Sequence, residues 1–374
     1  MLNALEVLGL TLALAHFTVP LAYYAYAKLK WLKRPWDLSI DENYKPKVTV
    51  IIPTYNESKL VEKKLDNIYE QDYLKELMEI VVVDSASTDG TPRLVEEWAR
   101  EHPEVSVRLL EEPIRRGMNP ALNFALKHVP SDTEIVVFTD ADSFWPSRAL
   151  KEIVKYFADP VVGAVTASIL PGGSEGGGEI EERVYRGYYN ILRVSESKLH
   201  STPVHNGALV AYRLELIQRI GGIPEFTGNN DSTPASIIAF MGYRALQVDD
   251  VIVWEPIIKN QFRRRVRRAQ HLLLSFLKTK QYARNLGVHA KSLFNCIWRV
   301  EWYLHVVNPW LLVLGLLLLM GGFVVYGSLI ALALIGVGLA LTALRDYRTW
   351  ILTQTALIVA AVRNIWTKDI IWSK

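Results

Sequence analysis

Two aspartates and a run of arginines have residue types and spacing that suit chemistry on phosphorylated substrates. Asp140 and Asp142 are separated by one residue and follow a short apolar run. Two carboxylates at this spacing suit Mg²⁺ or Mn²⁺, which usually shares its coordination with substrate phosphates, whereas a solvated strand end is the alternative. The arginines lie between residues 263 and 268. They can neutralise a diphosphate, although a basic helix face resting on anionic lipid fits the same pattern.

A third candidate is the lone acid in GNNDSTPAS, residues 228–236. Asn230-Asp231-Ser232 matches the N-glycosylation acceptor pattern, which acts only on the outer side of a membrane. An acid among turn-forming residues is otherwise a helix cap or a general base. We expect Ser232 and Thr233 to cap the helix that follows, which leaves Asp231 available as a base.

Composition points to a protein that is partly in a membrane. The chain has 374 residues, 50% of them hydrophobic, and its mean hydropathy of +0.12 is high for a purely soluble protein. The single cysteine, Cys296, excludes an intramolecular disulfide and a cysteine-rich metal site. The net charge is +3, and Lys and Arg cluster beside the apolar segments. A lipid bilayer is therefore a better partner than nucleic acid.

Residues 4–27 form an apolar run long enough to span a bilayer. No Lys or Arg precedes this run, whereas Lys28, Lys30 and Lys33 follow it. A basic flank after the run places the N-terminus outside and the following residues in the cytosol, and it disfavours a cleaved signal peptide. We therefore expect an anchor and a cytosolic body, in which the glycosylation pattern at Asn230 has no function.

The C-terminal part carries further apolar runs. Residues 303–326 and 328–344, separated by Gly327, predict a tight transmembrane hairpin. The shorter run at 351–366 contains Arg363 and predicts an interfacial helix, with a fourth span as the alternative. The expected protein is a multi-pass cell-membrane protein with about three spans and a cytosolic catalytic domain.

Between these segments, short apolar runs alternate with amphipathic stretches. The runs predict buried strands at 48–53, 79–84, 105–110 and 134–140, and the stretches predict helices at 58–70, 91–101 and 118–128. This alternation is typical of an α/β protein with a mostly parallel sheet, in which ligands bind beyond the carboxyl ends of the strands. No G-x-G-x-x-G follows the first run and no Walker lysine loop occurs, which disfavours dinucleotide oxidoreductases and P-loop enzymes.

Several motifs in consistent order carry a resemblance to a known family. They are PTYNES, VVDSASTDGT, RGMNPALNFAL and FTDADS, followed by NGALVAYRLELIQRIGG, NNDSTPASIIAFMGYRALQVDDVIVWEP and QFRRRVRRAQHL. From about residue 48 to 272 the chain resembles glycosyltransferase family 2, in its membrane cellulose-synthase-like and hyaluronan-synthase-like branch. That branch includes archaeal mannosyltransferases that act on lipid-linked saccharides. The resemblance implies the GT-A fold, a Rossmann-like mixed and mostly parallel sheet, together with transmembrane helices.

The resemblance implies a donor site built on the strand ends. Pro53, Tyr55 and Glu57 would line the nucleotide base and ribose, and Asp84 would contact the base. Asp140 would lie beside the ribose and diphosphate.

The resemblance also assigns the chemical step. Asp142 would ligate Mg²⁺ or Mn²⁺, and Asp231 would be the general base. An arginine of the Q-x-x-R-W-like segment would bind the diphosphate, and its register leaves both Arg264 and Arg267 open, the latter with His271 one turn beyond. The residues expected on the acceptor side are His205, Asn206 and Asn230.

Three departures from the family pattern bear on these roles. Met118 stands where a lysine is usual, so Arg115 or Arg116 is expected to supply the charge, and we assign Arg116 to the donor site. Asn230 replaces the first acid of the usual pair and leaves Asp231 as the single carboxylate. The tryptophan of Q-x-x-R-W is missing.

The expected organisation has five parts. They are an N-terminal anchor at 1–36, a GT-A catalytic domain at 37–258, basic interfacial helices at 259–302, a transmembrane hairpin at 303–345 and a C-terminal interfacial helix at 346–374. The glycine-rich stretch at 171–178 is expected to be a mobile loop between a nucleotide-binding half and an acceptor-facing half.

The implied function is metal-dependent, inverting transfer of a sugar from a nucleotide-diphosphate donor to a hydroxyl group of a polyprenyl- or dolichol-linked saccharide at the cytosolic face. Such acceptors occur in glycolipid and N-glycan biosynthesis. GDP-mannose is the favoured donor, with UDP-sugars next. The alternatives are a polyprenyl-phosphate sugar synthase, a processive polysaccharide synthase, and an inactive nucleotide-sugar-binding membrane protein.

Overall fold

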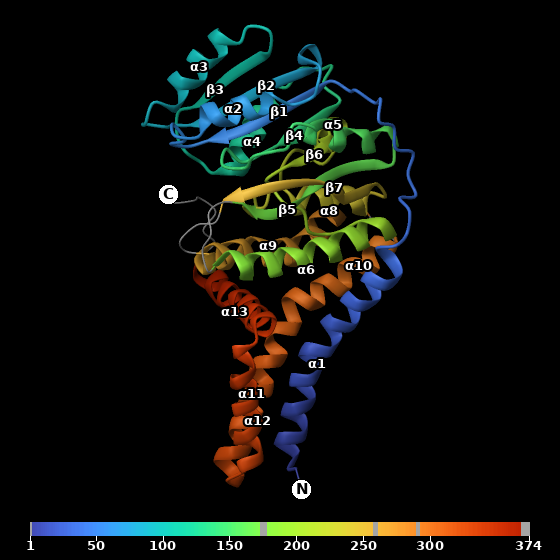
Figure 1. The fold of residues 1–374 in the computed structure, drawn as a ribbon, viewed down its shortest axis with the longest axis vertical. Helices are drawn as coiled ribbons and strands as arrows, with labels where there is room; N and C mark the ends of the chain where they lie inside the picture. Colours follow the sequence, from blue (N-terminus) through green and yellow to red (C-terminus); the bar gives the residue numbers. More distant parts are fainter. Residues whose placement is uncertain (1, 173–177, 257–260, 289–291, 368–374) are drawn as a thin grey trace.

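A seven-stranded sheet forms the centre of the body of this protein (Figure 1). The computed structural model describes residues 2–172, 178–256, 261–288 and 292–367. The strand order is β3-β2-β1-β4-β6-β5-β7, and every neighbouring pair is parallel except the two pairs made by β6. The strands are β1 (Val48–Thr54), β2 (Met78–Ser85), β3 (Ser106–Glu112), β4 (Ile135–Phe138), β5 (Val162–Gly172), β6 (Val210–Arg213) and β7 (Arg244–Pro256).

This sheet confirms the expected mixed, mostly parallel α/β fold. Successive side chains of a strand point to opposite faces, so β1 contributes Val50 and Ile52 to one core and Ile51 to the other. Buried helices cover both faces, as a parallel sheet requires. Helices α2, α3 and α5 pack on one face and α4, α7 and α8 on the other. Their bounds are α2 (Val61–Tyr69), α3 (Thr91–Glu101), α4 (Met118–Leu126), α5 (Ala149–Val154), α7 (Leu214–Arg219) and α8 (Ser232–Phe240).

Two long helices lie across the body on the side away from β1–β3 (Figure 1). They are α6 (Gly178–Leu199) and α9 (Gln261–Asn285). The glycine-rich stretch expected to be a mobile loop connects β5 to α6, and its residues 173–177 lie outside the described part of the chain.

Below these two helices, apolar helices form a column (Figure 1). They are α1 (Ala4–Tyr26), α10 (Leu293–Trp302), α11 (Asn308–Tyr326), α12 (Leu329–Ala340) and α13 (Arg345–Trp366). Among the described residues, the helical runs Ala4–Trp31 and Leu293–Tyr326 are long and apolar enough to cross a membrane. A third crossing requires that Leu329–Ala343 and Arg345–Trp366, bent by 107° at their junction, act as one span.

The column is joined to the body by α13. Its residues Ala356, Leu357 and Ala360 pack against Val266 and Leu273 of α9. At the other side of the column, α1 and α11 approach closely, because a methyl group on Gly9 would lie 2.9 Å from the carbonyl oxygen of Gly315. Helix α13 therefore connects the column to the same α9 that carries the arginine run.

Candidate active site

One cavity of about 370 Å³ opens at the carboxyl ends of β1 and β4 and continues between α6, α9 and α13. We call the part at the strand ends the strand-end half; it includes Pro53, Tyr55, Glu57, Arg115, Asp140 and Asp142. The other part is the helical half; it includes Tyr185, Arg186, Tyr189, Arg193, His305 and Leu357. Of the residues that the sequence nominates, those lining the cavity are Pro53, Tyr55, Glu57, Asp140, Asp142, His205, Asn206, Asn230, Asp231, Arg264 and Arg267, whereas Asp84 and Arg116 do not.

The loops after β1 and β2 are tied together beneath the strand-end half. Asn56 has a left-handed backbone (φ 54°), and its side-chain oxygen accepts from the backbone N–H of Thr88 at 2.9 Å. Asp84 is buried and accepts from the hydroxyl of Thr54 at 2.9 Å and from the backbone N–H of Ser87 at 2.8 Å. In this structure Asp84 therefore holds its own loop and lies behind the residues that face the cavity.

The two arginines that could replace the usual lysine have different surroundings. Arg116 extends away from the cavity lining and pairs with the buried Glu112, with N and O atoms 2.6 Å apart. Arg115 lines the cavity, and its guanidinium lies 3.7 Å from the centre of the Tyr55 ring. This cation–π contact places a positive charge over one of the proposed nucleotide-contacting residues.

Asp140 and Asp142 are close enough to repel each other. Burial, and then the charge of Asp142, raise the pKa of Asp140 to about 8. Beneath them, the ammonium of the fully buried Lys64 donates to the carbonyl of Ser143 at 2.5 Å and lies 4.2 Å from the Trp145 ring centre. Burial lowers the pKa of Lys64 to about 7, against the opposing charges of the two aspartates. Two repelling carboxylates over a fixed loop are suited to a divalent cation.

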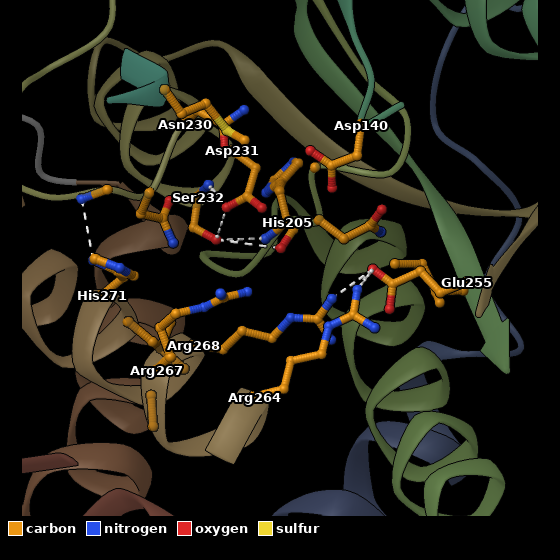
Figure 2. A pocket seen from close by; sticks show the side chains of 18 of the residues that line it. Asp140, His205, Asn230, Asp231, Ser232, Glu255, Arg264, Arg267, Arg268 and His271 are labelled. Atoms are coloured by element: carbon orange, nitrogen blue, oxygen red, sulfur yellow. Dashed lines mark hydrogen bonds and ion pairs between the residues drawn. The ribbon is translucent and has the colours of Figure 1, made fainter. Parts of the chain in front are cut away.

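Asp231 combines two of the roles proposed from the sequence. Its Oδ1 accepts from the backbone N–H and, at 2.8 Å, the hydroxyl of Ser232, and it is the N-cap residue of α8 (Figure 2). The expectation that Ser232 and Thr233 cap this helix is wrong, because Asp231 and the Asn229 side chain accept the first N–H groups instead. Burial raises the pKa of the Asp231 carboxyl, and the hydrogen bonds from Ser232 oppose that rise. Its second oxygen makes no hydrogen bond to the described residues, while Asp231 lines the cavity.

Neighbouring elements hold the loop that carries Asp231. Asn119 on α4 donates to the carbonyls of Pro224 and Thr227 at 2.8 and 2.7 Å. On the opposite side, His271 on α9 accepts from the backbone N–H of Gly228 at 3.1 Å (Figure 2). Gly228 has no room for a side chain, because a methyl group there would lie 2.7 Å from Cε1 of His271. The Asp231 loop and the arginines of α9 are thus fixed to one another.

The arginines of α9 meet a buried glutamate at the end of β7. Glu255 accepts from Arg268 at 2.6 Å and Arg186 at 2.9 Å, and Arg264 lies 3.7 Å away (Figure 2). Burial raises the pKa of Glu255, but Arg268, Arg186 and Arg264 together lower it to about 2. Arg264 also lies 4.0 Å from Asp142. Both registers of the arginine motif bring a guanidinium to the cavity, and Arg264 forms an ion pair with Asp142 of the aspartate pair.

The three nominated acceptor residues surround Asp231. The backbone N–H of His205 donates to the hydroxyl of Ser232 at 2.9 Å, and the Asn206 amide donates to the carbonyl of Ala167 at 2.5 Å. Burial, with the nearby charge of Arg193, lowers the pKa of His205 to about 3, so the imidazole is neutral at pH 7. The hydroxyl of the buried Tyr212 donates to the backbone carbonyls of Asn230 and Asp231 at 3.2 and 2.7 Å, which fixes the residue before the acid.

Sequence reasoning missed the helical half. Its residues come from α6, η4 (Tyr303–Val307) and α13, and the sequence nominated none of them. A usable signal lies in EIEERVYRGYYNILRVSESK, where acids, arginines and tyrosines recur at helical spacing on α6. The chain thus combines an aspartate pair, a buried acid and a cluster of arginines around one cavity, an arrangement suited to transfer from a phosphorylated donor.

Comparison with known proteins agrees with this chemistry. Residues 49–221 match the family model described as "Glycosyl transferase family 2". The chain is similar to the structure of the mannosyltransferase PcManGT from Pyrobaculum calidifontis, which was solved in complex with GDP-Man and Mn²⁺. The similarity covers 98% of this chain and 100% of the PcManGT chain, at 47% sequence identity and a TM-score of 0.87.

Curated relatives match over shorter segments. The chain is 31% identical over 120 residues to a beta-monoglucosyldiacylglycerol synthase of Synechocystis, covering 32% of this chain and 25% of the relative. It is 34% identical over 89 residues to a dolichyl N-acetyl-alpha-D-glucosaminyl phosphate 3-beta-D-2,3-diacetamido-2,3-dideoxy-beta-D-glucuronosyltransferase of Methanococcus voltae, covering 24% of this chain and 27% of the relative. The chain therefore spans about a quarter of the length of either relative.

Proposed function

Since the chain belongs to glycosyltransferase family 2, we propose that it transfers mannose from GDP-mannose to a hydroxyl group of a lipid-linked saccharide. The choice of donor is supported by PcManGT, which was solved with GDP-Man and is 47% identical. UDP-sugars are the second choice. The choice of acceptor is supported by the Methanococcus relative, whose name specifies a dolichyl phosphate-linked sugar.

The observation that carries the proposal is the position of Asp231 across the cavity from Asp140. In Figure 2 both carboxylates face the same space, and the arginines of α9 reach it from below. A donor whose diphosphate lies by Asp140 and Arg264 would expose its sugar toward Asp231. The arrangement fits a single in-line displacement with inversion, in which Asp231 Oδ2 takes the proton of the acceptor hydroxyl.

The aspartate pair fits Mg²⁺ or Mn²⁺. Burial, and then the charge of Asp142, raise the pKa of Asp140, and a dication would relieve the repulsion between the two carboxylates. The described residues contain no cluster of three or more His, Cys, Asp or Glu side chains that could hold a metal, so Asp140 and Asp142 would share the ion with donor oxygens. When bound, the ion would supply positive charge to the diphosphate leaving group. Arg264 and Arg267 would add guanidinium charge on the same side.

We place the reaction at the cytosolic face of a membrane. Lys28, Lys30 and Lys33 follow the first apolar helix, and this basic flank supports a cytosolic body. The helical half of the cavity is walled by His305 and Leu357, which belong to the apolar helical runs. A lipid-linked acceptor could thus reach Asp231 from the side of the bilayer.

Asp231→Asn tests the assignment of the base. The variant should bind GDP-mannose with Mn²⁺ as the wild type does, and its transfer rate should fall by about 10²- to 10⁴-fold, the usual contribution of a general base. Asp249→Asn is the matched control, because Asp249 is exposed on β7 and does not line the cavity. Near-normal turnover of Asp231→Asn would overturn the proposal.

A polyprenyl-phosphate sugar synthase is the second candidate. It is favoured by the arginines of the helical half, which suit a phosphate nucleophile. Against it, a phosphate is already ionised at pH 7 and would be repelled by the Asp231 carboxylate. An assay that offers polyprenyl phosphate and a polyprenyl-diphosphate-linked saccharide separately distinguishes the two functions.

A further inference from the structure

Arg193 on α6 is a buried cation that the described part of the protein does not neutralise. Only 8% of the residue is exposed, and its Nε atom is buried without a hydrogen-bond partner among the described residues. Within the described ranges its guanidinium makes no hydrogen bond or ion pair, and it lies over the face of Tyr189, 5.2 Å from the ring centre. Burying an unpaired charge is energetically costly, so a site that keeps such a charge usually binds a group of opposite charge.

The other arginines of the helical half are different. Arg186, two helical turns before Arg193, pairs with Glu182 at 3.1 Å and with Glu255 at 2.9 Å. Arg265 pairs with Glu182 at 2.7 Å. Arg193 interacts electrostatically with the carboxylates of Asp231 and Glu301. Neither carboxylate lies within 4.0 Å of the guanidinium, the limit for an ion pair.

Arg193 and Asp231 line the same cavity, and they are close enough for the charge of Arg193 to act on the Asp231 carboxyl. Burial raises the pKa of Asp231, and the positive charges of Arg193 and Arg268 oppose part of that rise. The cations that act on Asp140 are Arg268 and Arg264. Arg193 also lines the cavity together with His305 and Leu357, which lie in the apolar helical runs. Its position therefore corresponds to the acceptor and not to the donor diphosphate.

We propose that Arg193 binds an oxyanion of the acceptor, a phosphate or carboxylate group next to the hydroxyl that receives the sugar. The proposal rests on the proposed function and specifies its acceptor class as anionic. One guanidinium fork holds two oxygens of such a group. The ring of Tyr189 and the neutral His205 are near Arg193, and no carboxylate of the described residues lies at ion-pair distance from it.

The first test compares acceptors with the wild-type protein. The same hexose is offered as a neutral alkyl glycoside, as a sugar 1-phosphate alkyl ester and as an alkyl uronoside, each with the same chain. Transfer to the phosphate or the carboxylate acceptor should exceed transfer to the neutral one by about 10- to 100-fold in kcat/KM, the range of a charge-assisted hydrogen bond. The better of the two charged acceptors identifies the source of the oxyanion. Equal use of all three would overturn the proposal.

The second test removes the charge. Arg193→Gln should lower the ratio of kcat/KM for a charged acceptor to kcat/KM for the neutral glycoside, whereas a purely structural role would slow all acceptors alike and leave that ratio unchanged. Arg193→Lys should keep part of the preference. Arg183→Gln is the matched control, since Arg183 is exposed on the same helix and does not line the cavity.

A binding measurement keeps the inference separate from activity. In the presence of GDP and Mn²⁺, farnesyl phosphate should raise the melting temperature of the wild type more than farnesol does, and Arg193→Gln should remove that difference. Equal shifts by both ligands on the wild type would contradict an oxyanion site even if Arg193→Gln does not fold. If farnesyl phosphate binds through Arg193 and itself accepts mannose, the oxyanion site stands and the hydroxyl-acceptor function fails.

Discussion

The two halves of the cavity are built in opposite ways. In the strand-end half, Tyr55, Asp140 and Asp142 sit in loops directly after β1 and β4, and hydrogen bonds that involve Thr88 and Lys64 fix those loops. In the helical half, Arg186 on α6 is held by a buried ion pair to Glu255 at the end of β7. The strand-end half therefore depends on the sheet, whereas the helical half depends on the helices staying packed together.

The largest expected effect on the stability of the protein comes from a substitution in the ion pairs that hold the helical half. Glu255→Gln would leave Arg186, Arg264 and Arg268 without their shared counter-charge. Because removing one partner of a buried ion pair costs about 3–5 kcal/mol, the melting temperature should fall sharply. Removing one partner of an exposed ion pair, as in Glu97→Gln next to Arg93, should change the melting temperature little. An unchanged melting temperature for Glu255→Gln would show that the two halves do not differ in this way.

Asp142→Asn tests the strand-end half. It should nearly retain the wild-type melting temperature, since the ion pair of Asp142 with Arg264 is 4.0 Å long, and lose transfer by on the order of 10²- to 10³-fold through weaker stabilisation of the leaving group. The stabilisation of the protein by GDP-mannose with Mn²⁺ should fall as well. Asp72→Asn, on an exposed aspartate, is the control. A large loss of stability without GDP-mannose would contradict the proposed division of roles.

Gly228→Ala tests the junction of the halves. The added methyl group would push against His271 on α9 and displace the Asp231 loop, at a cost of about 1–3 kcal/mol. We expect slower transfer with nearly unchanged affinity for GDP. Gly187→Ala on α6 is the control, because a methyl group there meets nothing within 4 Å. Weaker GDP binding with normal transfer would show that Gly228 does not connect the two halves of the cavity in this way.

Ser232→Ala is the mildest change. Burial raises the pKa of Asp231 above the ordinary aspartate value, so transfer should fall as the pH drops through that raised pKa, when the base becomes protonated. The hydroxyl of Ser232 favours the ionised form, so its removal should move the acidic limb of the kcat/KM profile to higher pH by about one unit or less. A shift to lower pH, or none, would argue against Asp231 as the titrating group.

Part of the strand-end half could be predicted from the sequence because its residues directly follow buried strands. Buried strands at 48–53 and 134–140 place the residues that follow them at one edge of the sheet, and the structure has β1 and β4 side by side there. Arg115 and Arg116 mark the limit of this reasoning, since adjacent residues at the end of β3 point to different surroundings and only tertiary packing decides which one lines the cavity.

The helical half could not be predicted in the same way. Arg186 and Glu255 are 69 positions apart, and their contact exists only once α6 lies against β7. Hydropathy predicts the apolar helices, but it does not predict the 107° bend between Leu329–Ala343 and Arg345–Trp366, because neither Leu344 nor Arg345 at that junction is Pro or Gly. The sequence marks Asp231 as an unusual residue, yet its capping bond to Ser232 depends on the backbone conformation.

Helix α6 has a consequence for how such enzymes could diversify. Tyr185, Arg186, Tyr189 and Arg193 recur at helical spacing along one uninterrupted segment of 22 residues, and all four line the cavity. The loops that hold Asp140 and Asp142 are outside this segment. Substitutions within α6 alone could therefore alter what receives the sugar without changing what supplies it, and chimeras that exchange only this helix between relatives are a practical route to new specificities.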